Sequence, residues 1–185
     1  SNFLVDVGKR LGLEVIQDKA LNVIIKKPGT KGYENSPTVI LQGHMDMVCE
    51  KVQGSNHDFS MDPIKFEVEG DYIVAKETTL GADDGIAIAM ILAILESKDI
   101  PHPPIEALFT TDEESGMTGA KELEPKNLKG KILINLDSEE EGIILVSCAG
   151  GERNIISIPI EWKEPSEGKE CFELAVTGLM GGHSG

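Results

Sequence analysis

A long apolar segment near the middle of the chain, GIAIAMILAILES at residues 85–97, constrains the fold most strongly. Its side chains are apolar almost all round a helix, and this composition predicts a helix that is buried on most sides. Helices of this kind form the layers that cover the sheet of an α/β domain. The segment therefore favours an α/β fold in which a buried sheet provides the surface that the helix packs against.

Segments with the composition of strands lie on both sides of this helix. They are rich in β-branched residues, are bounded by turn-forming residues, and occur at 14–17, 22–27, 38–44, 105–111, 131–137 and 142–150. The segment 64–76 predicts a β-hairpin that turns at Gly70 and Asp71. Further helices are predicted at the N-terminus, ending near Gly12, and near 116–123. Strands that alternate with helices again predict an α/β fold.

The character of the sequence changes after Gly150 and Gly151. Two segments that alternate between apolar and polar residues, 153–162 and 170–178, predict strands, and a linker rich in Pro, Glu, Ser and Gly separates them. We therefore expect a domain at 1–151 and the beginning of a second domain at 152–185.

The composition limits the kinds of partner. The chain has 185 residues with a formal net charge of −15, and a negative field repels the phosphate backbone of nucleic acids. No apolar run reaches the roughly 18 to 20 residues of a membrane span, and the N-terminus lacks the order of a signal peptide. The three cysteines are far apart and form no CxxC motif. We expect a cytoplasmic protein without a membrane or nucleic-acid partner.

Ionisable residues occupy four predicted exits from the sheet, where functional groups of α/β proteins collect. They are His44 with Asp46, Asp83, Glu113 with Glu114, and Asp137. Each follows apolar residues, so its charge would be partly desolvated and costly if unpaired. A divalent metal removes this cost, and imidazole and carboxylate ligands suit zinc, which manganese or cobalt can replace.

A simpler alternative remains open at each position. His44 can be a capped loop histidine, and Asp83 and Asp84 can cap the buried helix, with Asp84 the expected N-cap. The Glu113–Glu114 pair can be a solvated turn, and Asp137 can belong to a charged surface loop. Their joint position at the exits of one sheet favours the metal hypothesis. One nitrogen of His44 would then bind metal, while Asp46 or a backbone carbonyl accepts from the other.

The sequence resembles a known family over residues 39–185. The blocks VILQGHMDMV, DYIVAKETTLGADDGIAIA, FTTDEESGMTGA, INLDSEEEG, SCAGG and VTGLMGGHSG occur in the order and at the spacings of the di-zinc dipeptidases that include aminoacyl-histidine dipeptidase, or peptidase D. The resemblance implies a zinc-peptidase-like mixed sheet flanked by helices, followed by a smaller α+β lid domain through which two subunits form a homodimer.

The resemblance also implies roles for the residues at the sheet exits. Asp83 would bridge two zinc ions, with His44 and Asp137 on one ion and Glu114 on the other. Glu113 would be the general base that moves a proton from the attacking water to the leaving amine.

Further positions receive roles from the same resemblance. Asp46 would support His44, and the peptide bond between Asp83 and Asp84 would be cis. His183, in the lid segment, would stabilise an oxyanion, although it can also be a plain loop histidine. His57 and His102 match nothing catalytic and are expected at the surface.

The expected activity is hydrolysis of dipeptides, Xaa-His types among them. A tripeptidase, an N-acyl amino acid hydrolase of the same superfamily and a non-catalytic metal-binding module remain alternatives. Family members are longer and supply a last zinc-binding histidine that these residues lack. We therefore expect the chain to be a fragment with weak or no activity.

Overall fold

The computed structural model describes residues 1–138, 140, 142–148, 150, 154–164, 167–168, 170 and 172–179. The chain divides into a compact unit formed mainly by residues 1–141 and a second unit at 142–181. The strands and helices described below belong to the compact unit. The domain boundary after Gly151 stays a prediction.

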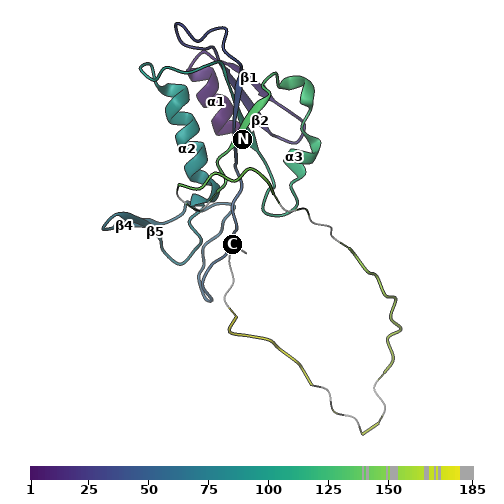
Figure 1. Ribbon diagram of the computed structural model, residues 1–185. Coiled ribbons are helices and arrows are strands. Elements are labelled where there is room, and N and C mark those ends of the chain that lie inside the picture. The colour runs from purple at the N-terminus through teal and green to yellow at the C-terminus, as the bar shows by residue number, and fades with distance from the viewer. Residues whose placement is uncertain are drawn as a thin grey trace. The chain divides into compact units, whose positions relative to one another are not determined.

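The centre of the compact unit is a mixed sheet with the strand order β1-β2-β6-β3-β7 (Figure 1). The strands are β1 (Glu14–Gln17), β2 (Val23–Lys27), β3 (Val39–His44), β6 (Ile105–Thr110) and β7 (Ile132–Asn135). β1, β2 and β6 pair in antiparallel fashion, whereas β3 runs parallel to both β6 and β7. The predicted mixed sheet is therefore confirmed, with β3 in the parallel part.

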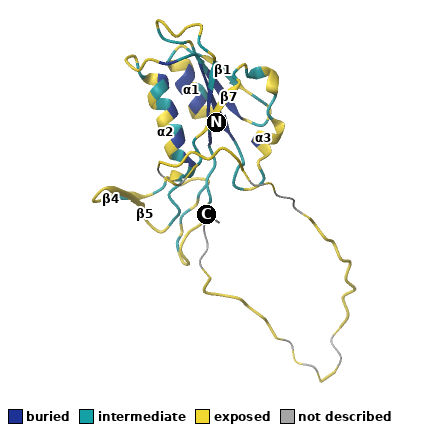
Figure 2. Ribbon diagram, viewed as in Figure 1, coloured by how far each residue is buried: buried dark blue, intermediate teal, exposed yellow. Residues whose placement is uncertain are grey.

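Helices cover both faces of this sheet (Figure 1). α1 (Asn2–Arg10) and α2 (Ala82–Glu96) contribute Leu4 and Ile91 to a core that also contains Phe109 of β6. On the opposite face, Leu108 belongs to a smaller cluster. Leu123, which lies between α3 (Thr118–Glu122) and the 3₁₀ helix η1 (Pro125–Asn127), packs against this cluster. Figure 2 shows the buried residues gathered between these layers.

Helix α2 is less buried than its composition predicts. Ala87, Ile91 and Leu95 recur at a spacing of four residues and are buried toward the sheet. On another face of the helix, the side chains of Ile86 and Met90 are 58% and 51% exposed. The prediction of burial on most sides is therefore wrong within the described residues, because there the sheet covers one face of the helix.

The predicted hairpin is present as β4 (Phe66–Glu69) and β5 (Tyr72–Ala75), which turn at Gly70 and Asp71. The strands predicted at 142–150, 153–162 and 170–178 are wrong for their described residues, which carry no strand. An alternating pattern makes a segment suitable for a sheet, but a strand also needs a pairing partner for its backbone groups.

The prediction that His102 lies at the surface is also wrong, because the residue is buried. Thr30 and His102 hydrogen-bond each other through backbone and hydroxyl groups, which fastens the segment before β6 onto the loop after β2. The ring nitrogen Nδ1 lies 2.8 Å from the carbonyl oxygen of Pro103.

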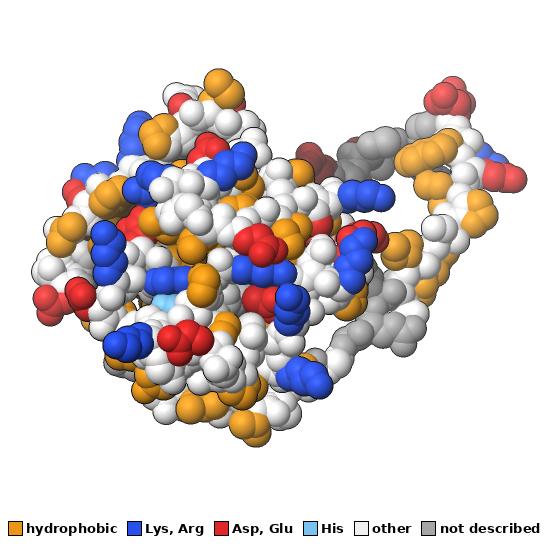
Figure 3. Space-filling view, turned by 90° about the horizontal axis from the view of Figure 1, so that it is seen from above, with side chains coloured by type: hydrophobic (Ala, Val, Ile, Leu, Met, Phe, Trp, Pro, Cys, Tyr) orange, Lys and Arg blue, Asp and Glu red, His pale blue; other side chains and the backbone are white. Residues whose placement is uncertain are grey.

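The surface is not uniformly acidic. In the view from above, Lys and Arg side chains are interspersed with acidic and hydrophobic side chains (Figure 3). None of the helices in the described part of the chain has the length and apolar character to cross a membrane.

Candidate metal centre

The parallel pairing of β3 with β6 and β7 brings the predicted exits together. His44, the last residue of β3, is opposite Thr110, the last residue of β6, and Gln42 is opposite Asn135, the last residue of β7. The segments that follow β6 and β7 carry the Glu113–Glu114 pair and Asp137. Because parallel strands end at the same edge of a sheet, the candidate residues converge there.

His44 is almost completely buried at this edge, with 1% of its side chain exposed. Its Nε2 lies 3.1 Å from Oδ1 of Asp83 and 4.0 Å from Oδ1 of Asp137. Its Nδ1 lies 3.0 Å from the backbone carbonyl oxygen of Asp46 and 3.5 Å from the side-chain Oδ1 of the same residue. The carbonyl is therefore the nearer acceptor for Nδ1–H, which leaves Nε2 toward the two carboxylates.

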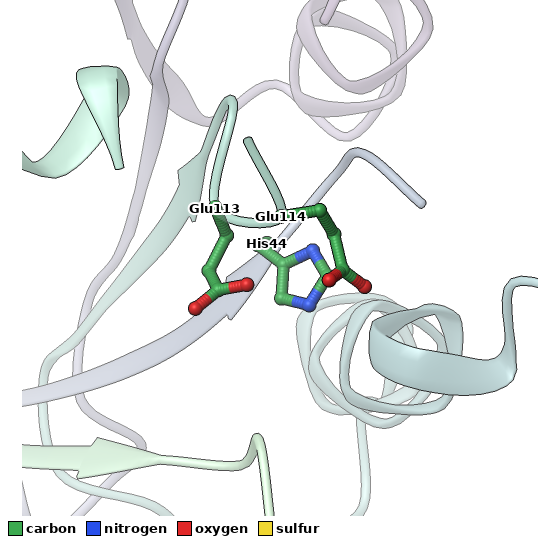
Figure 4. Close-up of side chains that lie close together, drawn as sticks. All are labelled: His44, Glu113 and Glu114. Carbon is green, nitrogen blue, oxygen red and sulfur yellow. The ribbon is translucent and has the colours of Figure 1, made fainter. Parts of the chain in front are cut away.

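Glu113 and Glu114 come from the turn after β6 and lie on either side of the His44 imidazole (Figure 4). One ligand atom each from His44, Glu113 and Glu114 lies within 4.8 Å of the others, and the same holds for His44, Asp83 and Asp137. His44 is thus common to two groups of side chains that can hold a metal ion.

The carboxylate of Asp46 accepts hydrogen bonds from the turn that carries the glutamates. Its Oδ1 accepts the backbone N–H of Glu113 at 3.1 Å, and its Oδ2 accepts that of Glu114 at 3.0 Å. This contact was not anticipated from the sequence, because it joins residues far apart along the chain.

The acids that surround the His44 imidazole shift the pKa values of His44 and Asp137. Burial alone would lower the pKa of His44, but its hydrogen bond to Asp83 and the nearby carboxylate charges outweigh burial and raise that pKa. Burial raises the pKa of Asp137, although the His44 charge opposes it, and the charges of Asp83 and Glu113 raise that pKa further. A divalent cation at Nε2 would offset this clustered negative charge, so the donor set fits such an ion.

Asp84 belongs to the site in a way that the sequence did not indicate. It is buried, and its Oδ2 accepts the backbone N–H of His44 at 3.1 Å, so its expected role as a helix cap is wrong. A Cβ at Gly43 would lie 2.6 Å from this oxygen, so glycine leaves room for the contact. Burial raises the pKa of Asp84 to about 6. The cis peptide bond predicted between Asp83 and Asp84 is present.

His183 lies outside the described residues. The bridging role of Asp83 and the division of ligands between two ions stay predictions. The residues that are described define a class of protein: an α/β domain with a buried histidine and clustered carboxylates at the carboxyl ends of its parallel strands, which suits a metal-dependent enzyme.

The chain belongs to peptidase family M20/M25/M40, whose pattern it matches over residues 40–176. It is 43% identical over all 185 residues to the cytosol non-specific dipeptidase of Escherichia coli strain K12, of which it covers 38%.

Solved structures agree with this family. An aminoacylhistidine dipeptidase from Vibrio alginolyticus is 52% identical, with a TM-score of 0.74 over 76% of this chain and 29% of the other. A tripeptidase from Staphylococcus aureus is 31% identical, with a TM-score of 0.62 over 76% of this chain and 38% of the other. The chain therefore spans well under half the length of these relatives.

Proposed function

We propose that the protein containing this chain is a cytoplasmic metal-dependent dipeptidase. The observation that carries the proposal is the convergence of His44, Asp83 and Asp137 at one sheet edge, beside a pair of glutamates from the turn after β6. The relatives whose names describe a cytosolic dipeptidase and an aminoacylhistidine dipeptidase support this reaction and location.

Zinc is the cofactor that the donor set fits best, since the site combines imidazole and carboxylate groups. His44, Asp83 and Asp137 would hold one ion, and Asp83 and Glu114 would contribute to a second. When bound, zinc would lower the pKa of a water molecule and polarise the scissile carbonyl. Manganese or cobalt would serve as a substitute.

Glu113 is the general base in this proposal. Its carboxylate would accept a proton from the attacking water and deliver it to the leaving amine. The position beside His44 supports this role, because the proton acceptor must lie within reach of the reacting water. The adjacent glutamates would have different roles, with Glu114 as a metal ligand and Glu113 as the general base.

The substrate would be a small peptide with a free N-terminus, including dipeptides of the Xaa-His type. His183 would stabilise the developing oxyanion from the lid domain, and the lid would also form a homodimer interface. A tripeptidase is the second candidate, since the similar Staphylococcus aureus protein bears that name. A purely structural metal module is disfavoured because the similar proteins are named as dipeptidases.

The test is the Glu113→Gln variant of the full-length protein. Glutamine keeps the size of the side chain but cannot carry the proton, so kcat on dipeptides should fall by about 10²- to 10⁴-fold while the zinc content stays at two ions per subunit. Glu122→Gln, at an exposed position of α3, is the matched control and should retain the parental kcat.

Elemental analysis and a panel of dipeptides, tripeptides and N-acylated amino acids provide the measurements. Near-parental turnover by Glu113→Gln with a normal zinc content would refute the assigned base. Preferential cleavage of tripeptides or N-acylated substrates would replace the dipeptidase by the corresponding alternative.

A further inference from the structure

The Asp46 carboxylate accepts hydrogen bonds from two successive backbone N–H groups. One oxygen accepts from Glu113 and the other from Glu114, at 3.1 and 3.0 Å. Hydrogen bonds from N–H groups to an ionised carboxylate are stronger than those between neutral groups. A single side chain just beyond β3 thereby holds the backbone of both glutamates.

The turn that carries the glutamates has a demanding conformation. Asp112 and Met117, which flank the pair, both have left-handed backbone angles, with φ of 59° and 56°. Such angles are uncommon for residues other than glycine and need support from their surroundings. The backbone of Asp112 accepts from Gly116 N–H at 3.1 Å, which closes the turn on itself. Asp46 supplies the connection from this turn to the histidine strand.

Both ends of the segment that contains this turn are held by other hydrogen bonds. The backbone N–H of Thr111 donates to Oδ1 of the buried Asn22 at 3.2 Å, and Asn22 Nδ2 donates to the carbonyl of Gly119 at 2.8 Å. These bonds tie both ends of the 111–119 segment to the residue just before β2. The Asp46 bonds act at its centre, where the functional side chains are.

His44 has a nearer partner than the side chain of Asp46. Its Nδ1 lies 3.0 Å from the Asp46 carbonyl, and this backbone group remains whatever side chain occupies position 46. The carboxylate oxygen is farther, at 3.5 Å. Removal of the carboxylate should therefore disturb the glutamate turn more than the imidazole.

We propose that Asp46 is a positioning residue for the Glu113–Glu114 pair, acting through their backbone N–H groups. The inference rests on the proposed function for its catalytic consequence, because it concerns the base and the second metal ligand. It assigns the carboxylate a different task from support of the His44 ring.

The experiment uses Asp46→Ala and Asp46→Asn in the full-length protein. Hydrogen–deuterium exchange of the peptide covering 111–117 should become at least about 10-fold faster in Asp46→Ala, because both amide bonds are lost. The dissociation constant of the more weakly held Zn²⁺ should rise about 10- to 100-fold, the usual effect of losing an outer-shell partner. The value of kcat should fall by a similar factor with little change in KM.

Asp46→Asn should lie between the parent and Asp46→Ala, since its single carbonyl oxygen can accept one of the two amides. The control is Glu122→Gln at an exposed position of α3, which removes a carboxylate near the turn and leaves Asp46 and the turn intact. This control should alter neither exchange of 111–117 nor Zn²⁺ affinity. An equal effect of Glu122→Gln would overturn the inference.

Double variants separate the two tasks of Asp46. In a Glu114→Ala background, Asp46→Ala should add less than about 3-fold to the loss of Zn²⁺ affinity, because the ligand that Asp46 positions is already gone. In a His44→Ala background its full effect on the weaker site should persist. The reverse pattern, or unchanged exchange of 111–117 in Asp46→Ala, would assign the carboxylate to His44.

These outcomes are distinguishable from failure of the proposed function. Retained turnover by Glu113→Gln would refute the catalytic assignment of that glutamate. The exchange rate of 111–117 would still decide whether Asp46 holds the turn, because it is measured without substrate.

Discussion

At the scale of single residues, the site is defined by partly exposed acids and the buried Asp84, which surround one buried histidine. His44 receives its neighbours from three directions: the carbonyl of Asp46 at Nδ1, the Asp83 carboxylate at Nε2, and the Asp84 carboxylate at its backbone N–H. The sequence identified His44, Asp46 and Asp83 because each follows apolar residues at an element boundary. It did not reveal the contact of Asp84, since an acid before a helix is ordinarily a cap.

Asp84 makes the metal-free protein sensitive to pH. Its pKa rises from an ordinary value of 3.8 to about 6 in the folded chain. The folded state therefore binds more protons than the unfolded state between these values, so stability falls as the pH rises from about 4 to 6 and stays lower above. Asp84→Asn cannot ionise and keeps an oxygen for the His44 N–H.

We expect metal-free Asp84→Asn to exceed the parent in unfolding free energy at pH 7.5 by on the order of 2 kcal/mol. The two proteins should be equally stable near pH 4. Urea denaturation in the presence of a chelator measures both values, and Asp71→Asn at an exposed hairpin position is the control. An advantage that grows toward acidic pH would contradict the assigned direction.

At the scale of elements, the glutamate turn depends on its attachment to two strands. Asp46, just beyond β3, holds the centre of the turn, and the buried Asn22, just before β2, holds both ends. Sequence patterns predicted the strand before the turn and the short helix after it. They did not predict the attachments, because these join residues that only the order of strands brings together.

Asn22→Ala should lower the unfolding free energy by about 2 to 4 kcal/mol, because the partly buried N–H of Thr111 and the buried carbonyl of Gly119 would lose their partner. Chemical denaturation of the purified chain measures the loss. Asn56→Ala, at an exposed position, should change stability by less than about 0.5 kcal/mol. Equal losses in both variants would show that Asn22 has no special role.

At the scale of the whole molecule, the proposed division of ligands gives two unequal sets of donors. His44, Asp83 and Asp137 combine an imidazole with two carboxylates, which resembles a catalytic zinc site with an open position. The proposed second set, Asp83 with Glu114, contains carboxylates alone. Such a set suits zinc less well, so the two positions should differ in affinity.

The isolated 185-residue chain should therefore bind no more than one Zn²⁺ tightly. It should hydrolyse dipeptides about 100-fold or more slowly than the full-length protein, since the second Lewis acid and the complete lid contribute to charge stabilisation. Calorimetric titration with Zn²⁺ and a dipeptide assay on both proteins provide the comparison. Two tight sites with full turnover in the short chain would contradict this expectation.

The sequence by itself determined the strands of the sheet, their exits and the acids that stand there, because periodicity and turn residues are local properties. The tertiary structure alone decided which atoms meet. It directed the Asp46 carboxylate to the amides of Glu113 and Glu114, buried Asp84 beneath His44, and left part of α2 exposed. These outcomes depend on β3 lying between β6 and β7, and a strand order is a long-range property that no local pattern encodes.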